Sequence, residues 1–97
     1  MKFQSSWNQG FHMTFENGLS ASVQWGFGTY TDNHYKSGFE DTTTSTTAEV
    51  AVANEDGELI DLVPFLPEDC RANDVVCGHL SPDEVVEFLI RVKNYEM

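Results

Sequence analysis

The stretch that decides the fold is FHMTFENGLSASVQW, residues 11–25. Apolar side chains alternate with polar ones both before and after a central Glu-Asn-Gly sequence. This period-two pattern is typical of strands that bury one face, so the stretch predicts a β-hairpin. The apolar positions are Phe11, Met13, Phe15, Leu19, Ala21, Val23 and Trp25.

The length of the hairpin loop follows from the pairing that it imposes. A two-residue loop at 17–18 would set Phe15 opposite Ser20 and mix the two faces. A three-residue loop at 16–18 pairs Phe15 with Leu19 and ends in glycine, which suits a type I turn with a bulge. We therefore expect the longer loop. The same register pairs Met13 with Ala21 and Phe11 with Val23.

A second hairpin is predicted by the same arithmetic. Alternating apolar residues precede a Glu-Asp-Gly sequence at 55–57 and follow it. A three-residue loop pairs Val52 with Ile60 and Val50 with Leu62. The two hairpins would then share one turn chemistry.

Residues 82–95 are predicted to form a helix. Ser81 is the expected N-cap, Pro82 the first helical residue, and Glu84 the partner in a capping box. We expect the helix to pack on the apolar face of the hairpins. Its apolar face is formed by Val85, Phe88, Leu89 and Val92.

These elements predict a single α+β domain over residues 1–97. The expected architecture is a small antiparallel sheet of about four strands, in two hairpins, with one C-terminal helix packed on one face. Residues 26–46 are interpreted as a long polar loop with several aromatic side chains. Residues 64–80 are interpreted as a connector that contains at most one short strand or turn.

Composition and charge exclude several function classes. The chain has 97 residues, of which 40% are hydrophobic, enough for one core. It carries 5 basic and 16 acidic residues, a net charge of -11, with 12 of the acidic residues in the half from 49 to 97. Such acidity argues against direct nucleic-acid binding and against docking on anionic lipid. No apolar run approaches the ~20 residues of a membrane span.

The sequence offers no strong motif for catalysis or metal binding. Cys70, Cys77 and His79 have a Cys-x6-Cys-x-His spacing, whereas structural zinc sites use tight cysteine pairs. Neither a nucleophile elbow nor a phosphate-binding glycine loop is present. We therefore expect no enzyme activity, cofactor or metal, and we expect both cysteines to be reduced in a cytoplasmic protein.

Two groups of side chains are the candidate partner-binding residues. Aromatic residues on a polar loop are typical anchors of protein-binding surfaces, and acidic residues favour a basic partner surface. The first group, in the long loop, is Tyr30, Asp32, Tyr35, Phe39, Glu40 and Asp41. The second group, an acidic patch, is Glu55, Asp56, Glu58, Glu68 and Asp69.

Three runs resemble a family of small uncharacterised accessory proteins of tailed bacteriophages and prophages. They are GFHMTFENGLSASVQWGFGTYTDN, TAEVAVANEDGEL and GHLSPDEVVEFLIRV, and together they span most of the chain. The shared motifs are a Met-Thr-Phe-x-Asn-Gly hairpin, a Ser-Val-Gln-Trp/Phe-Gly strand end, a Thr/Asn-Ala-Glu strand and a Pro-Asp-Glu-Val helix start. The resemblance implies a phage product that acts in the bacterial cytoplasm, and it carries no catalytic residues.

We therefore expect a non-enzymatic accessory protein that binds and inhibits a host bacterial protein, such as an antiviral defence component. Two alternatives remain open at this point: a protein that binds or sequesters a small nucleotide signal, and a nucleic-acid mimic whose carboxylates replace phosphates. An exposed edge strand would also allow a homodimer.

Overall fold

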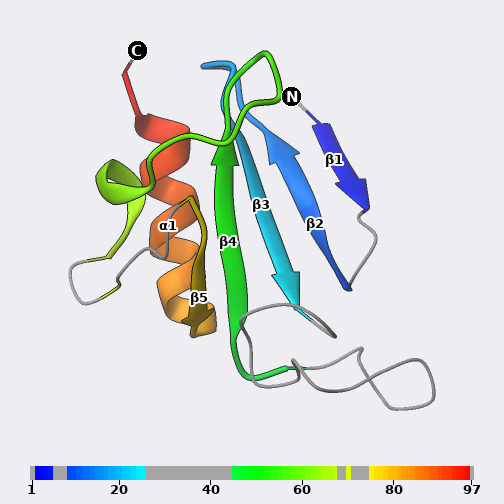
Figure 1. Cartoon of the computed structure of the whole chain (residues 1–97), viewed down its shortest axis with the longest axis vertical. Helices are drawn as coiled ribbons and strands as arrows, with labels where there is room; N and C mark the ends of the chain where they lie inside the picture. The colour runs from blue at the N-terminus through cyan, green and yellow to red at the C-terminus, as the bar shows by residue number, and fades with distance from the viewer. Residues whose placement is uncertain (1, 6–8, 26–44, 68–69, 71–74, 97) are drawn as a thin grey trace.

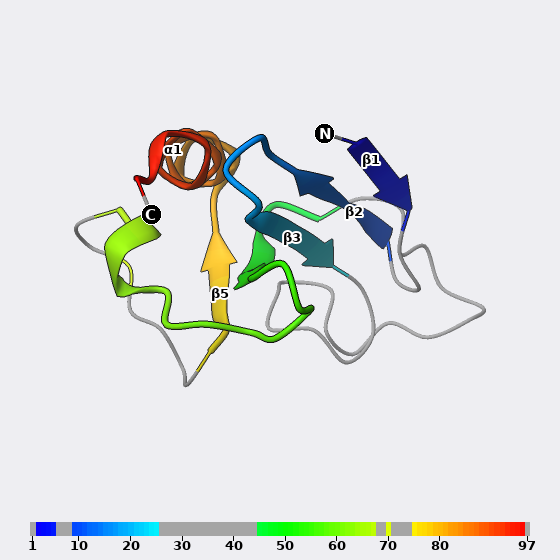
Figure 2. The same cartoon turned by 90° about the horizontal axis from the view of Figure 1, so that it is seen from above.

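A five-stranded antiparallel sheet carries a single α-helix on one face (Figures 1 and 2). The computed structural model describes residues 2–5, 9–25, 45–67, 70 and 75–96, and these counts apply to that part of the chain. The strands follow one another in chain order across the sheet, which confirms the α+β class. The elements are β1 (Lys2–Ser5), β2 (Gln9–Thr14), β3 (Ser20–Trp25), β4 (Ala48–Ala53), the 3-10 helix η1 (Val63–Phe65), β5 (Cys77–Leu80) and α1 (Pro82–Asn94).

The first hairpin, formed by β2 and β3, has the predicted register and loop. Met13 lies opposite Ala21, as expected for the three-residue loop. The Phe15 N–H donates to the Leu19 carbonyl at 2.9 Å, and the Gly18 N–H donates to the Phe15 carbonyl at 3.0 Å. Gly18 has a φ of +88°, the left-handed region that favours glycine.

Only one of the two residue pairings predicted for the second hairpin is present. Val52 does lie opposite Ile60, whose N–H donates to the Val52 carbonyl at 2.9 Å. The predicted pairing of Val50 with Leu62 is wrong, because Val50 lies opposite Cys77 of β5. The outer edge of β4 is therefore shared by two segments that are far apart in the sequence.

The physical reason is that the chain leaves the sheet soon after Ile60. Leu62 is fully buried and is the N-cap residue of η1. Pro64 follows inside η1, where its missing N–H could not have continued a strand ladder. β5 then takes the vacated edge, and β1 adds a further edge strand beside β2. These two additions and one loss make five strands rather than about four.

The core lies between α1, η1 and the sheet, with Phe88 and Val92 of α1 fully buried. This confirms the predicted apolar face of the helix. α1 contacts β3, β4 and β5, while β1 and β2 extend to one side of it (Figure 2). None of the helices in the described ranges is long and apolar enough to cross a membrane.

Both ends of α1 have specific polar partners. At the start, the Ser81 hydroxyl accepts from the Glu84 N–H at 3.3 Å, and Glu84 Oε1 accepts from the Ser81 N–H at 2.8 Å, so the capping box is confirmed. At the end, the Asn17 side-chain amide donates to the carbonyls of Val92 at 2.8 Å and Tyr95 at 3.1 Å. The β2–β3 turn therefore fixes the end of the helix.

Candidate functional site

Three of the predicted acidic residues meet at the turn after β4. We call Glu55, Asp56 and Glu58 the acidic turn, and all three are exposed. Asn54 fixes the backbone beneath them, because its Oδ1 accepts from the N–H groups of both Asp56 and Glu58 at 3.0 Å. Gly57, with a φ of +82°, donates its N–H to the Asn54 carbonyl at 3.0 Å. The carboxylates thus project from a turn that is held in one conformation.

The acidic turn packs against the turn of the first hairpin. A Cβ built on Gly18 would overlap the Glu55 side chain, whose Cγ would lie 2.7 Å away. The side chain of Glu55 is therefore held over the Gly18 backbone, whereas Asp56 and Glu58 lie on the outer part of the turn. Of the three carboxylates, Asp56 and Glu58 are the ones available to a partner without loss of packing.

The remaining candidate residues lie outside the described ranges. The structure therefore places three of the candidate residues in one turn, and the partner-binding role of both groups stays a prediction. The residues concerned are Tyr30, Asp32, Tyr35, Phe39, Glu40, Asp41, Glu68 and Asp69.

The sheet face opposite α1 contains a depression of about 770 Å³. Its floor is made of outward-facing side chains of the central strands, and its lining includes Glu55 of the acidic turn. Two cross-strand hydroxyls are joined there, since Thr14 Oγ1 and Ser20 Oγ are 2.8 Å apart. The lining residues are Lys2, His12, Thr14, Gly18, Ser20, Ala21, Ser22, Glu49, Ala51, Ala53, Asn54, Glu55, Gly57, Leu59 and Val76.

Polar side chains at and beside this depression are hydrogen-bonded to one another. The Gln24 amide donates to Ser22 Oγ at 3.1 Å and lies 3.4 Å from His12 Nε2, so it stands between the hydroxyl and the imidazole. Among the described lining residues, Lys2 is the one lysine or arginine and His12 the one histidine, against Glu49 and Glu55. This balance suits neutral or cationic groups better than phosphates.

A second concavity, which we call the apolar groove, runs along the flank of α1. It has a volume of about 450 Å³ and lies between the first turns of the helix and the sheet, with residues of β2, β3, β4 and β5 in its lining. Its surface is mainly hydrophobic. The lining residues are Phe11, Val23, Trp25, Ser45, Thr46, Thr47, Ala48, Leu80, Pro82, Val85, Val86 and Leu89.

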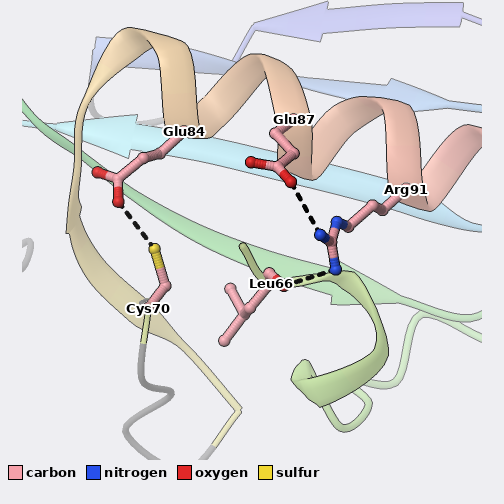
Figure 3. A network of polar contacts seen from close by, with 5 residues as sticks. All are labelled: Leu66, Cys70, Glu84, Glu87 and Arg91. Carbon is pink, nitrogen blue, oxygen red and sulfur yellow. Dashed lines mark hydrogen bonds and ion pairs between the residues drawn. The ribbon is translucent and has the colours of Figure 1, made fainter. Parts of the chain in front are cut away.

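The other flank of α1 holds a polar network instead (Figure 3). The Cys70 thiol donates to Glu84 Oε2 at 3.1 Å, and Arg91 donates to the Leu66 carbonyl at 2.9 Å and to Glu87 at 2.8 Å. These bonds attach the segment after η1 to the helix. Within the ranges that the structure describes, no group of three or more His, Cys, Asp or Glu side chains is placed to hold a metal ion.

The network gives Glu84 a pH-dependent role in stability. Hydrogen bonds from the Ser81 backbone and the Cys70 thiol lower the pKa of the Glu84 carboxyl. A carboxyl whose pKa is lowered by folding stabilises the protein above its unfolded pKa of about 4.3, and this stability is lost as the pH falls through the folded pKa.

We expect Glu84→Gln to lower the free energy of unfolding at pH 7, since glutamine keeps the shape but loses the charge. Because acid removes the charge of the native carboxylate as well, the difference between the two proteins should shrink as the pH falls through the lowered pKa of Glu84. Urea unfolding at a series of pH values measures it. Glu96→Gln, at an exposed position after the helix, is the control. A difference that stayed constant with pH would contradict this role.

Sequence reasoning missed the depression and the apolar groove. The signal for the depression was present, because His12, Thr14, Ser20 and Ser22 occupy the polar positions of the alternating pattern. That pattern shows which face is polar, but it does not show that the face is hollowed. The groove depends on where α1 crosses the sheet, which no local pattern specifies.

Comparison of the chain with protein-family models, with curated proteins and with solved structures finds no match in any of the three.

Proposed function

We propose that this chain is a non-enzymatic phage accessory protein that binds a host bacterial protein and inhibits it, with an antiviral defence component as the target. The proposal places its action in the host cytoplasm. The observation that carries the binding role is the acidic turn, in which exposed carboxylates are fixed on one preformed loop. A loop that is already ordered loses little conformational entropy when it binds.

The charge of the chain favours a basic target surface. A net charge of -11 attracts positively charged partners over a distance, and the acidic turn concentrates part of that charge. Electrostatic attraction mainly raises the association rate, by about 10- to 1000-fold, and weakens with salt. The expected partner is therefore a protein with a basic patch, such as a nuclease surface that normally contacts nucleic acid.

The test compares two double variants that change the net charge equally. Asp56→Asn/Glu58→Gln alters the acidic turn, and Glu87→Gln/Glu96→Gln alters exposed positions on α1 and just after it. The tagged native protein is first used to capture its partner from bacterial lysate at low salt, followed by mass spectrometry. We expect the first variant to bind the identified partner about tenfold more weakly at low salt, and the second to bind like the native protein.

Two results would contradict the proposal. Equal weakening by both variants would show a general charge effect without a specific acidic turn. Stoichiometric capture of a partner whose binding ignores both variants and salt would show that another surface is used. Inhibition is measured separately, as loss of the captured protein's activity on addition of the native chain.

A second candidate function is the binding of a small ligand in the depression. Its volume of about 770 Å³ lies within the range of ligand pockets, about 300–1,000 Å³. The excess of glutamate over lysine at its rim disfavours a nucleotide signal and favours a neutral or cationic polar ligand. A thermal-shift panel separates these cases, because a ligand that binds only the folded protein stabilises it by RT ln(1 + [L]/Kd), so the melting temperature rises with the logarithm of the ligand concentration once that concentration exceeds Kd.

A further inference from the structure

The outer face of α1 carries a second stripe that the core does not use. Asp83, Val86, Ile90 and Lys93 follow one another at spacings of three, four and three residues, which places them on one side of a helix. All four are exposed, with 56% of Val86 and 53% of Ile90 accessible to solvent. We call these four residues the outer stripe.

The outer stripe is distinct from the two other faces of the helix. Phe88 and Val92 point into the core, and Arg91 is bonded to the Leu66 carbonyl on the flank shown in Figure 3. Val86 belongs both to the outer stripe and to the apolar groove. Exposed apolar surface therefore continues from the groove onto the outer side of the helix.

The sequence of the outer stripe is complementary to itself when it is reversed. Val86 and Ile90 each lie two residues from Phe88, and Asp83 and Lys93 each lie five residues from it. Consider two such helices packed antiparallel through their outer stripes, with the two-fold axis at the level of Phe88 along each helix. This arrangement brings Val86 opposite Ile90 and Asp83 opposite Lys93. A parallel arrangement would instead bring aspartate to aspartate and lysine to lysine, which repel.

We propose that a second copy of this chain docks on the outer stripe, forming an antiparallel homodimer with two apolar contacts and two ion pairs across the helices. A two-fold interface uses the same patch on both subunits, and the reversed pattern meets that requirement. The apolar groove at Val86 widens the contact. The stripe's own charges cancel, so the pairing is compatible with a chain whose acidic turn lies on a different element.

The interface is small, so the dimer forms reversibly. α1 has 13 residues and is about 20 Å long, which provides less contact than a standard interface of about 1,600 Å². Sedimentation or light scattering over a range of about 10 μM to 1 mM should show the molecular mass rising with concentration from one chain to two. A native protein that stays monomeric throughout this range overturns the proposal.

Ile90→Gln tests the apolar centre of the stripe. The substitution removes an exposed side chain, keeps a good helix former and leaves the core intact. Its control is Val63→Gln, because Val63 is 69% exposed and lies on η1 beside the other flank of α1. We expect Ile90→Gln to weaken dimerisation at least tenfold and Val63→Gln to leave it unchanged. A dimer that is insensitive to Ile90→Gln would point to the β1 edge and overturn the proposal.

A charge swap tests the antiparallel orientation. Asp83→Lys places lysine opposite Lys93 of the partner copy at both ends of the interface, and should weaken the dimer about tenfold. Asp83→Lys/Lys93→Asp exchanges the two charges and should restore most of the affinity. Far-UV circular dichroism checks that the helix persists in both. If the double variant did not recover the affinity of the native dimer, antiparallel pairing would be excluded. None of these substitutions alters the acidic turn, on which the proposed host binding depends.

Discussion

Phe88→Ala is expected to lower the free energy of unfolding by about 3–5 kcal/mol. Phe88 is completely buried at the centre of α1, in the cluster where the helix meets the sheet. Removing its ring forfeits the transfer free energy of a large apolar side chain and leaves a cavity that the surrounding strands fill only in part. A domain of this size has a total stability of about 5–15 kcal/mol, so the loss is a large fraction of it.

The chain supplies a matched control for this change. Phe3 of β1 has the same side chain but is 78% exposed, so Phe3→Ala should change stability by less than about 1 kcal/mol. Urea unfolding measures both, with the midpoint expected to fall for Phe88→Ala at an unchanged slope. Equal losses for the two variants would mean that the helix contributes no more to stability than the exposed edge of the sheet.

Phe88 also shows what the sequence could predict about this fold. Its position in the apolar face of the helix followed from periodicity alone, and the Ser81 capping box from three residues of local sequence. The loop ending at Gly18 followed from register, since only one loop length aligns the apolar residues. These features depend on neighbours within a few residues, where pattern and structure are directly linked.

The edges of the sheet could not be predicted in the same way. The alternation of apolar and polar residues allows Val50 to pair with either Leu62 or Cys77. In the structure Val50 pairs with Cys77, because Leu62 is buried in the core beneath α1. β1 has a single strongly apolar residue, Phe3, so its pattern was too weak to predict a strand. The pairing of β4 with β5 depends on a contact between distant parts of the chain, whereas β1 pairs with β2, the next strand along the chain.

In the candidate site, too, local features could be predicted from the sequence and features that combine several elements could not. The acidic turn was predicted because Glu55, Asp56 and Glu58 are close in sequence and share one hairpin. The depression and the apolar groove were not predicted, because each combines side chains from several elements. The outer stripe could have been found, since the spacing of Asp83, Val86, Ile90 and Lys93 is visible in the sequence. Only the structure shows that this side of α1 is exposed.

Asn17→Ala is expected to cost about 1–3 kcal/mol, an effect that the turn sequence alone would not suggest. The Asn17 amide donates to the carbonyls of Val92 and Tyr95, and its Oδ1 accepts from the Leu19 N–H at 3.0 Å. One side chain thus forms hydrogen bonds both within the hairpin turn and to the end of α1. Its removal leaves partly buried backbone groups without these partners, which is more costly than the loss of an exposed hydrogen bond.

Asn54 is the matched control, because it occupies the second hairpin and its hydrogen bonds within the described ranges are to residues of its own turn. Its Oδ1 accepts from Asp56 and Glu58, both exposed, so Asn54→Ala should cost less than Asn17→Ala. Urea unfolding of the two variants measures the difference. If Asn54→Ala were equally costly, the contribution of Asn17 would come from turn geometry rather than from its bonds to the helix.

Asn17→Asp separates the two roles of the Asn17 side chain. Aspartate still accepts from the Leu19 N–H, so the turn keeps its hydrogen bond. It cannot donate to the Val92 carbonyl, and it places a negative charge against the negative end of the helix dipole. We therefore expect Asn17→Asp to destabilise the protein at least as much as Asn17→Ala at pH 7, and to recover part of the loss when acid protonates the new carboxylate. Recovery in acid would identify the helix end, rather than the turn, as the source of the stability that Asn17 provides.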